Sequence, residues 1–201
     1  MTASTIPMGH LVYEVDAEDV VTRIDGEWDA FAAQNAARSC LATQVIGRSL
    51  WEFVRDPALR AIYEALFASI RGSGGEKSFP FRCDSPHQRR TMRMTVRDLG
   101  AGAVRITSAL EEVASIAPPL MVVAASSGAE LLRRCSICLT FGWRGRWAGL
   151  DELLEHEALF DRERPLRVIY AVCEECRHDL ARLAASPARR LGEEPVTADR
   201  V

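Results

Sequence analysis

The sequence predicts an α+β protein in which a five-stranded antiparallel sheet carries helices on one face, with a small four-cysteine module after it. Two β-prone runs come first, helical periodicity follows, and three runs of alternating apolar and polar residues come next. Two CxxC pairs then lie in the C-terminal third of the 201-residue chain. These three observations together predict the fold class.

The opening of the chain predicts a hairpin and a helix. The short runs LVYEV (11–15) and VVTRI (20–24) are β-prone and are joined by the turn-forming residues DAED. The segment GEWDAFAAQNAA (26–37) then changes to helical spacing. We therefore expect two paired strands followed by a helix.

A longer helix is predicted over 56–72. Asp56 can cap its first turn, and Pro57 is tolerated there because the first helical N–H needs no partner. Glycines at 72–75 end it. One apolar stripe recurs at spacings of three and four residues and consists of Leu59, Ile62, Tyr63, Leu66, Phe67 and Ile70.

Three strands are predicted after this helix, over 77–83, 90–98 and 102–110. Their residues alternate with a period of two, so each strand has one apolar face. In the middle strand Met92 and Met94 share the apolar face. We expect the three strands to complete an antiparallel sheet that is buried on one side.

Composition limits which binding partners and which cellular location we expect for the protein. Hydrophobic residues make up 48% of the chain and the net charge is −3, so there is a core but no global attraction to nucleic acid or to an anionic membrane. The longest apolar stretch, 116–125, contains two prolines and is far shorter than the ~20 residues of a spanning helix. No signal-peptide pattern begins the sequence. We expect a cytoplasmic protein that does not enter a membrane.

The segments 21–35, 45–71 and 79–97 resemble, in this order, a bacterial PAS-like family. The resemblance covers roughly 9–113. It implies a sensor or interaction domain that binds a small ligand between its sheet and helices or forms a homodimer.

The resemblance also allows the residues that bind two cofactors in this family, flavin and haem, to be sought in this sequence. Leu50 stands where light-sensing flavin members carry a reactive cysteine, and 58–71 contains no histidine that could be an axial haem ligand. Cysteine-adduct flavin and helix-histidine haem are therefore not expected, and the PAS ligand stays unknown. The side chains that could line a ligand pocket, or that could simply form the core, are Trp28, Phe31, Trp51, Phe53, Tyr63, Phe79, Phe81 and Met94.

The rest of the chain divides into three parts. Residues 114–130 contain few charges and two prolines, and we expect a linker there with a short strand at 120–125. Residues 131–186 hold both CxxC pairs, and 187–201 is expected to be a flexible tail.

Within the cysteine module the periodicity predicts three elements. A helix is expected over 147–160, a strand over 167–176 leading into the second pair, and a closing helix over 177–186. A segment of about 55 residues can hardly fold from its own core, which is a physical reason to expect a metal here.

Cys135, Cys138, Cys173 and Cys176 are the predicted metal ligands. Two paired thiolates satisfy the tetrahedral shell that zinc prefers, and four of them leave no open position, so the site is structural. The 34 residues between the pairs exceed the 15–20 of the commonest pattern, so the insertion must be folded. A redox-active pair and four buried free thiols are the alternatives.

This segment is also similar to a short cysteine module found beside PAS and response-regulator domains. Trp147 occupies the tryptophan-bearing loop of that module. Tyr170 stands where its histidine usually falls, and Glu174 replaces its proline. The four cysteines are kept, which implies a small zinc-ribbon-like unit.

Together these observations predict a non-enzymatic signalling protein that senses or dimerises through 9–113 and docks a protein partner through its zinc module. No nucleotide-binding or hydrolase motif is present in the sequence. The alternatives are a thiol redox sensor that releases zinc and forms disulfides, and a nucleic-acid-binding regulator. The modest charge near 131–184 argues against nucleic acid.

Overall fold

The computed structural model describes residues 10–35, 37–116, 119–125, 131–155 and 165–189. The first part of the chain contains, in order, β1 (His10–Val15), β2 (Val21–Gly26), α1 (Trp28–Gln34), η1 (Arg38–Cys40), α2 (Ala42–Val45), η2 (Leu50–Glu52), α3 (Pro57–Ser73), β3 (Glu76–Arg82), β4 (Gln88–Gly100) and β5 (Ala103–Ser115). The second part contains β6 (Val122–Ala124), β7 (Leu132–Cys135), β8 (Phe141–Trp143), β9 (Arg146–Ala148), α4 (Leu150–Leu154), β10 (Leu166–Ala171) and α5 (Glu174–Ala185).

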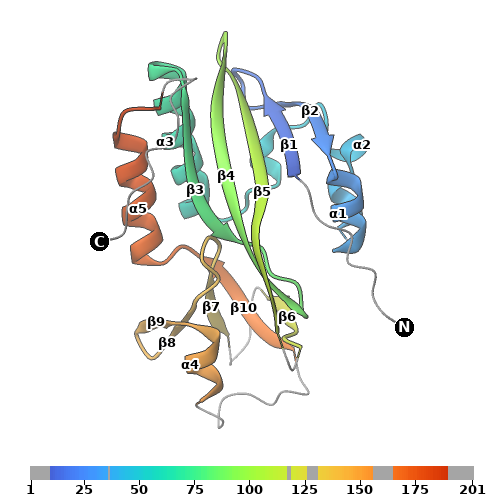
Figure 1. Cartoon of the computed structure of the whole chain (residues 1–201), viewed down its shortest axis with the longest axis vertical. Helices are drawn as coiled ribbons and strands as arrows, with labels where there is room; N and C mark the ends of the chain where they lie inside the picture. Colours follow the sequence, from blue (N-terminus) through green and yellow to red (C-terminus); the bar gives the residue numbers. More distant parts are fainter. Residues whose placement is uncertain (1–9, 36, 117–118, 126–130, 156–164, 190–201) are drawn as a thin grey trace.

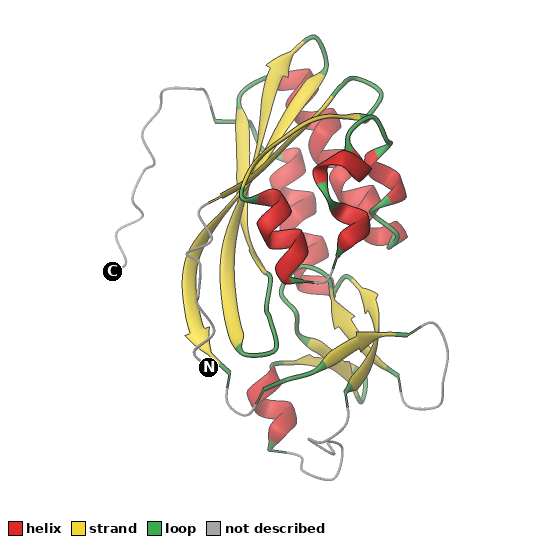
Figure 2. Ribbon diagram, turned by 90° about the vertical axis from the view of Figure 1, so that its right-hand side faces the viewer, coloured by secondary structure: helices red, strands yellow, loops and turns green. Residues whose placement is uncertain are grey.

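The first part forms an antiparallel sheet with the strand order β2-β1-β5-β4-β3. Its helices lie on one face (Figure 2). The period-two alternation accounts for this arrangement, because Met92, Met94 and Val96 of β4 are buried whereas Arg93 between them is exposed. The predicted five-stranded antiparallel sheet is confirmed.

The long helix α3 begins and ends as its sequence predicts. The side chain of Asp56 accepts hydrogen bonds from the backbone N–H groups of Ala58 and Leu59, at 2.9 and 3.5 Å. Gly74 follows the helix with φ of +69°, a conformation that glycine adopts without strain. The predicted stripe is buried except for Leu59, which is half-buried, and its most deeply buried members are Leu66, Phe67 and Ile70.

The second part of the chain forms a sheet of its own, in which β7, β8 and β9 were not predicted from the sequence. Its strand order is β6-β10-β7-β8-β9, with β10 parallel to both β6 and β7 and the remaining pairs antiparallel. The helix expected over 147–160 is wrong at its start, since residues 146–148 form β9 and α4 covers only Leu150–Leu154. Two-strand pairing with β8 overrides the helical periodicity there. Residues 156–160 of that expected helix lie outside the described residues.

Other boundaries also move. The strand predicted at 120–125 is present as β6. Strand β5 extends to Ser115, so the expected linker at 114–130 contains the end of one sheet and a strand of the other. The closing helix expected at 177–186 starts three residues earlier, at Glu174.

The two parts share one hydrophobic core. Ile137, Val172 and Leu180 from the second part belong to the same buried cluster as Leu66 and Phe67 of α3. Helix α5 lies beside α3 and β3 rather than with the second sheet (Figure 1). A smaller cluster under the second sheet consists of Phe141, Trp143, Ala148, Leu153 and Val168. The C-terminal module is therefore packed into the first part.

None of the helices within the described residues is long and apolar enough to span a membrane.

We expect Leu66→Ala to lower the free energy of unfolding by about 2–5 kcal/mol, because Leu66 is fully buried and its truncation leaves a cavity in the shared core. Urea unfolding followed by circular dichroism measures this loss. Glu64→Ala on the exposed side of the same helix is the matched control, and it should change stability by no more than about 0.5 kcal/mol. Equal effects of the two substitutions would contradict this packing.

Candidate metal centre

Parallel pairing of two strands brings the two CxxC pairs together. The register of β10 against β7 places Ala171 opposite Cys135, so both strands end at the same edge of the second sheet. The first pair begins at Cys135, the last residue of β7, and continues into the turn before β8, whereas the second pair lies at the start of α5. Residues separated by more than 30 positions in the sequence thus meet at one point.

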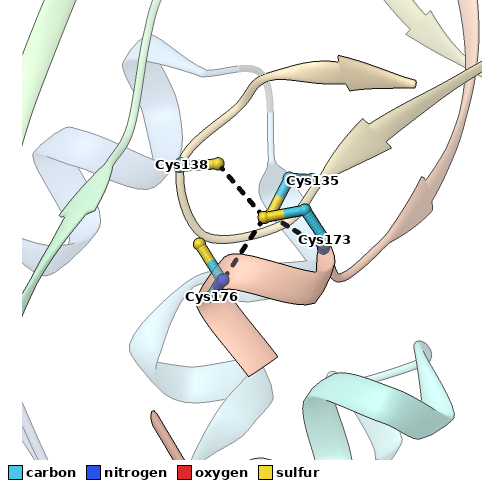
Figure 3. Close-up of side chains that lie close together, drawn as sticks. All are labelled: Cys135, Cys138, Cys173 and Cys176. Carbon is cyan, nitrogen blue, oxygen red and sulfur yellow. Dashed lines mark hydrogen bonds between the residues drawn. The ribbon is translucent and has the colours of Figure 1, made fainter. Parts of the chain in front are cut away.

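The sulfur atoms of Cys135, Cys138, Cys173 and Cys176, here called the thiol centre, lie within 4.8 Å of one another (Figure 3). The Sγ atoms of Cys138 and Cys173 are 3.7 Å apart. Sulfurs bound at ~2.3 Å to a tetrahedral zinc ion would be about 3.8 Å apart. All four are free thiols. Their spacing fits a single metal ion that contacts all four.

The first pair sits in a turn that directs backbone donors at sulfur. The N–H of Ile137 donates to the Sγ of Cys135 at 3.4 Å. Backbone hydrogen bonds from Cys135 to Thr140 and from Leu139 to Cys135 close the turn, at 2.8 and 3.2 Å. Leu139 has φ of +59°, which is uncommon for a residue other than glycine and shows how tight the turn is.

The second pair forms the beginning of α5. Cys173 is the N-cap residue, and its Sγ accepts a hydrogen bond from the N–H of Cys176 at 3.4 Å. The N–H of Cys173 in turn donates to the Sγ of Cys135 at 3.5 Å (Figure 3). The backbone hydrogen bond from Cys176 favours the thiolate form of Cys173, but burial of this thiol is the larger effect and raises its pKa.

Contacts to the first part of the chain fix residues 135–138, here called the CSIC turn, in place. The N–H of Arg82, at the end of β3, donates to the carbonyl oxygen of Ile137 at 2.8 Å. The hydroxyl of Ser136 donates to Oδ2 of Asp56, the N-cap residue of α3, at 3.4 Å. The thiol centre therefore lies where β3, α3, α5 and the second sheet meet.

The thiols shift one another's pKa values in opposite directions. Hydrogen bonds from Cys138 and Cys176 hold the pKa of Cys135 well below its ordinary value. The pKa of Cys176 is raised, first because its thiol donates a hydrogen bond to Cys135. Burial raises the pKa of Cys173 to about 12. One thiolate is thus stabilised by neighbours that keep their protons, and a cation is needed before all four can ionise.

Three arginines flank the pairs in the sequence, but their described contacts lie elsewhere. Arg133 and Arg134 stack over aromatic rings of β9 and β8, at 5.3 and 5.2 Å from the ring centroids. Arg177 donates to the carbonyl oxygen of Val172 at 3.3 Å. The immediate surroundings of the centre include backbone N–H groups, the start of α5 and the hydroxyl of Thr140, which lies 3.0 Å from the Sγ of Cys138.

The remaining cysteines and nearby histidines are separate from the cluster. Burial raises the pKa of Cys83, as expected for a thiol that acts as a small hydrophobe. The carbonyl oxygen of Cys40 accepts a hydrogen bond from the indole of Trp28. His178 is exposed on α5 and does not belong to the cluster, and His156 lies outside the described residues.

The eight side chains named for a PAS ligand pocket divide into two groups. Tyr63, Phe79 and Met94 are buried, and the hydroxyl of Tyr63 contacts the sulfur of Met94 at 3.3 Å. The half-buried members are Trp28, Phe31, Trp51, Phe53 and Phe81. Trp51, Phe53 and Phe81 pack on the shared core, Trp28 contacts Tyr13 edge-on, and Phe31 lies under the guanidinium of Arg90.

Sequence reasoning missed two residues that bind the elements carrying the four cysteines. Asp56 was expected only to cap α3, yet it also binds the CSIC turn through Ser136. Lys77 is the only lysine of the chain, which is a signal visible in the sequence, and it binds the far end of α5. Neither contact could be read from spacing, because each joins residues that are 80 or more positions apart.

The donor set fits zinc, since four thiolates around one point are the ligands and the number that a structural zinc ion takes. No protein-family model matches the chain, and no curated protein matches it either. The sulfur geometry is therefore the strongest pointer to what this protein does.

Proposed function

We propose that the protein is a cytoplasmic bacterial regulator in which a PAS-like sensing or dimerisation domain is coupled to a structural zinc centre that docks a protein partner. The observation that carries the proposal is the convergence of four cysteine sulfurs within 4.8 Å of one another. The order of elements, two strands, helices and three strands over 10–115, supports the PAS-like part.

Zinc, when bound, would supply a cross-link between the CSIC turn and the first turn of α5. The chain's own residues orient the ligands for this, because the backbone N–H groups of Ile137 and Cys176 donate hydrogen bonds to the sulfurs of Cys135 and Cys173. Structural zinc contributes apparent binding energies of ~10–16 kcal/mol in finger-like peptides. Such a contribution suits a second sheet whose own buried cluster is small.

A binding role is favoured over catalysis by the ligand set. Four protein thiolates complete a tetrahedral shell and leave no position for a substrate or water. We therefore propose a non-enzymatic protein that binds a protein partner. Homodimerisation through the PAS-like domain belongs to the same proposal, and sedimentation velocity measures it.

We expect one zinc ion per chain in protein purified without a metal-affinity tag or chelator, because the four sulfurs form one site. Elemental mass spectrometry beside a protein assay measures this ratio. The double substitution Cys135→Ser and Cys173→Ser should abolish zinc. Cys40→Ser, which removes a thiol outside the centre, should leave the ratio at one. Full zinc content in the double variant would refute the site.

Zinc affinity should weaken by at least tenfold for each unit that the pH falls from 8 to 6. The pKa of Cys173 is about 12 and that of Cys176 is also raised, so zinc must displace their protons, and lower pH favours the protonated form. Competition with a chromophoric chelator, corrected for the chelator's own protonation, measures this dependence. A pH-independent affinity over this range would contradict thiolate ligation.

The 3.7 Å separation of two sulfurs favours a second candidate function, a thiol redox sensor. Hydrogen peroxide would take two electrons from Cys138 and Cys173, so that an S–S bond forms, the O–O bond breaks and two water molecules leave with the thiol protons. Loss of two of its four ligands would then release the zinc ion.

For this candidate we expect zinc release to accompany the loss of two hydrogen atoms per chain under mild peroxide treatment. A zinc-sensitive dye and intact mass spectrometry follow the two events, and peptide mapping should find the Cys138–Cys173 disulfide. Cys138→Ser should keep its remaining thiols reduced at the same peroxide dose. Disulfide formation that is equally fast in this variant would contradict the assignment.

A further inference from the structure

Helix α5 is anchored at both of its ends, and one buried residue holds its middle. Its N-terminal end carries Cys173 and Cys176 of the thiol centre. Of its twelve residues, Leu180 is the one that is buried. A helix of this length is marginal by itself in water, so its position depends strongly on what holds its ends.

The far end of α5 is held by Lys77. Its Nζ donates to the carbonyl oxygens of Leu183, Ala184 and Ser186, at 2.7, 2.8 and 2.6 Å, and to the hydroxyl of Ser69 on α3, at 2.7 Å. These carbonyls end the helix and carry its partial negative charge, which an ammonium group stabilises. Lys77 is only 4% exposed although it is charged.

A second tie lies directly beside this contact. Glu76 and Arg189 exchange two backbone hydrogen bonds of 3.0 Å, and their side chains form an ion pair. The side chain of Glu76 also pairs with Arg97 on β4. The segment after α5 is thereby joined to the edge strand β3 of the first sheet (Figure 1).

Between its ends α5 covers α3 incompletely. An open, mostly apolar groove of ≈ 430 Å³ runs between the two helices, lined by Ala58, Ile62 and Ala65 of α3 and by Arg177 and Leu180 of α5. Small alanine side chains line this groove, so the middle of the helix is attached through Leu180, which belongs to the shared core, and through the half-buried Leu183 and Ala184.

From these contacts we infer that the thiol centre is a metal-controlled latch, in which zinc at Cys173 and Cys176 keeps α5 docked on α3 and loss of zinc releases α5, exposing Lys77 and the apolar side of α3. The inference rests on the proposed zinc centre and adds its regulatory output. It requires no change in the antiparallel sheet, since that sheet makes its own ladder of hydrogen bonds across β2, β1, β5, β4 and β3.

The single lysine makes the latch directly measurable. Zinc-bound protein and protein stripped with a chelator are treated with acetic anhydride at limiting dose, and acetylation of the Lys77 peptide is quantified by mass spectrometry against a reference peptide in the same tube. We expect acetylation to be at least tenfold faster after zinc removal. Cys40→Ser is the control variant and should show the same zinc-dependent change.

Hydrogen–deuterium exchange separates release of α5 from general unfolding. After zinc removal, amides of α5 should exchange faster while those of β1 and β5 stay protected. Lys77→Met should speed exchange in the last turn of α5 while zinc stays at one per chain, because this variant opens only the far end.

Three results would overturn the latch, and they are distinguishable. Unchanged Lys77 acetylation after confirmed zinc loss would leave the zinc centre standing and remove its regulatory role. Simultaneous loss of protection in β1 and β5 would show that zinc supports the whole fold and controls no local release. Absence of metal from the purified protein would defeat the proposed zinc centre itself, and the latch with it.

Discussion

The parallel pairing of β10 with β7 is the constraint on which the rest of the structure depends. This register ends both strands at one edge and so delivers two cysteine pairs, 34 residues apart, to a common point. Because α5 starts directly at the second pair, the same pairing also determines where the last helix begins and in which direction it leaves the second sheet.

The thiol centre lies at a junction and does not form the centre of an independent module. The CSIC turn is bound to the end of β3 and to the capping residue of α3, and its Ile137 belongs to the core shared with the first sheet. A metal ion held here would cross-link the CSIC turn to the first turn of α5. The cost of placing four thiolates side by side explains why a cation suits this position.

Several features were predictable from sequence because they depend on local periodicity. The alternation in β4 and the three-and-four spacing in α3 specify which side chains are buried, and the Asp–Pro start and glycine end of α3 appear where they were expected. The region around 146–148 was not predictable in this way, since a short segment with helical spacing pairs with β8 once that strand is available. Tertiary pairing decided between two local structures of similar intrinsic preference.

The sequence by itself determined the α+β class, the burial pattern of the first sheet and the identity of the four candidate ligands, because each follows from residue type and spacing. Only the tertiary structure decided that α5 joins the first part, that Asp56 holds the CSIC turn, and that the single lysine caps the far end of α5. These contacts join residues 80 to 109 positions apart. No periodicity connects such residues, and their meeting is set by how the strands pair and the helices pack.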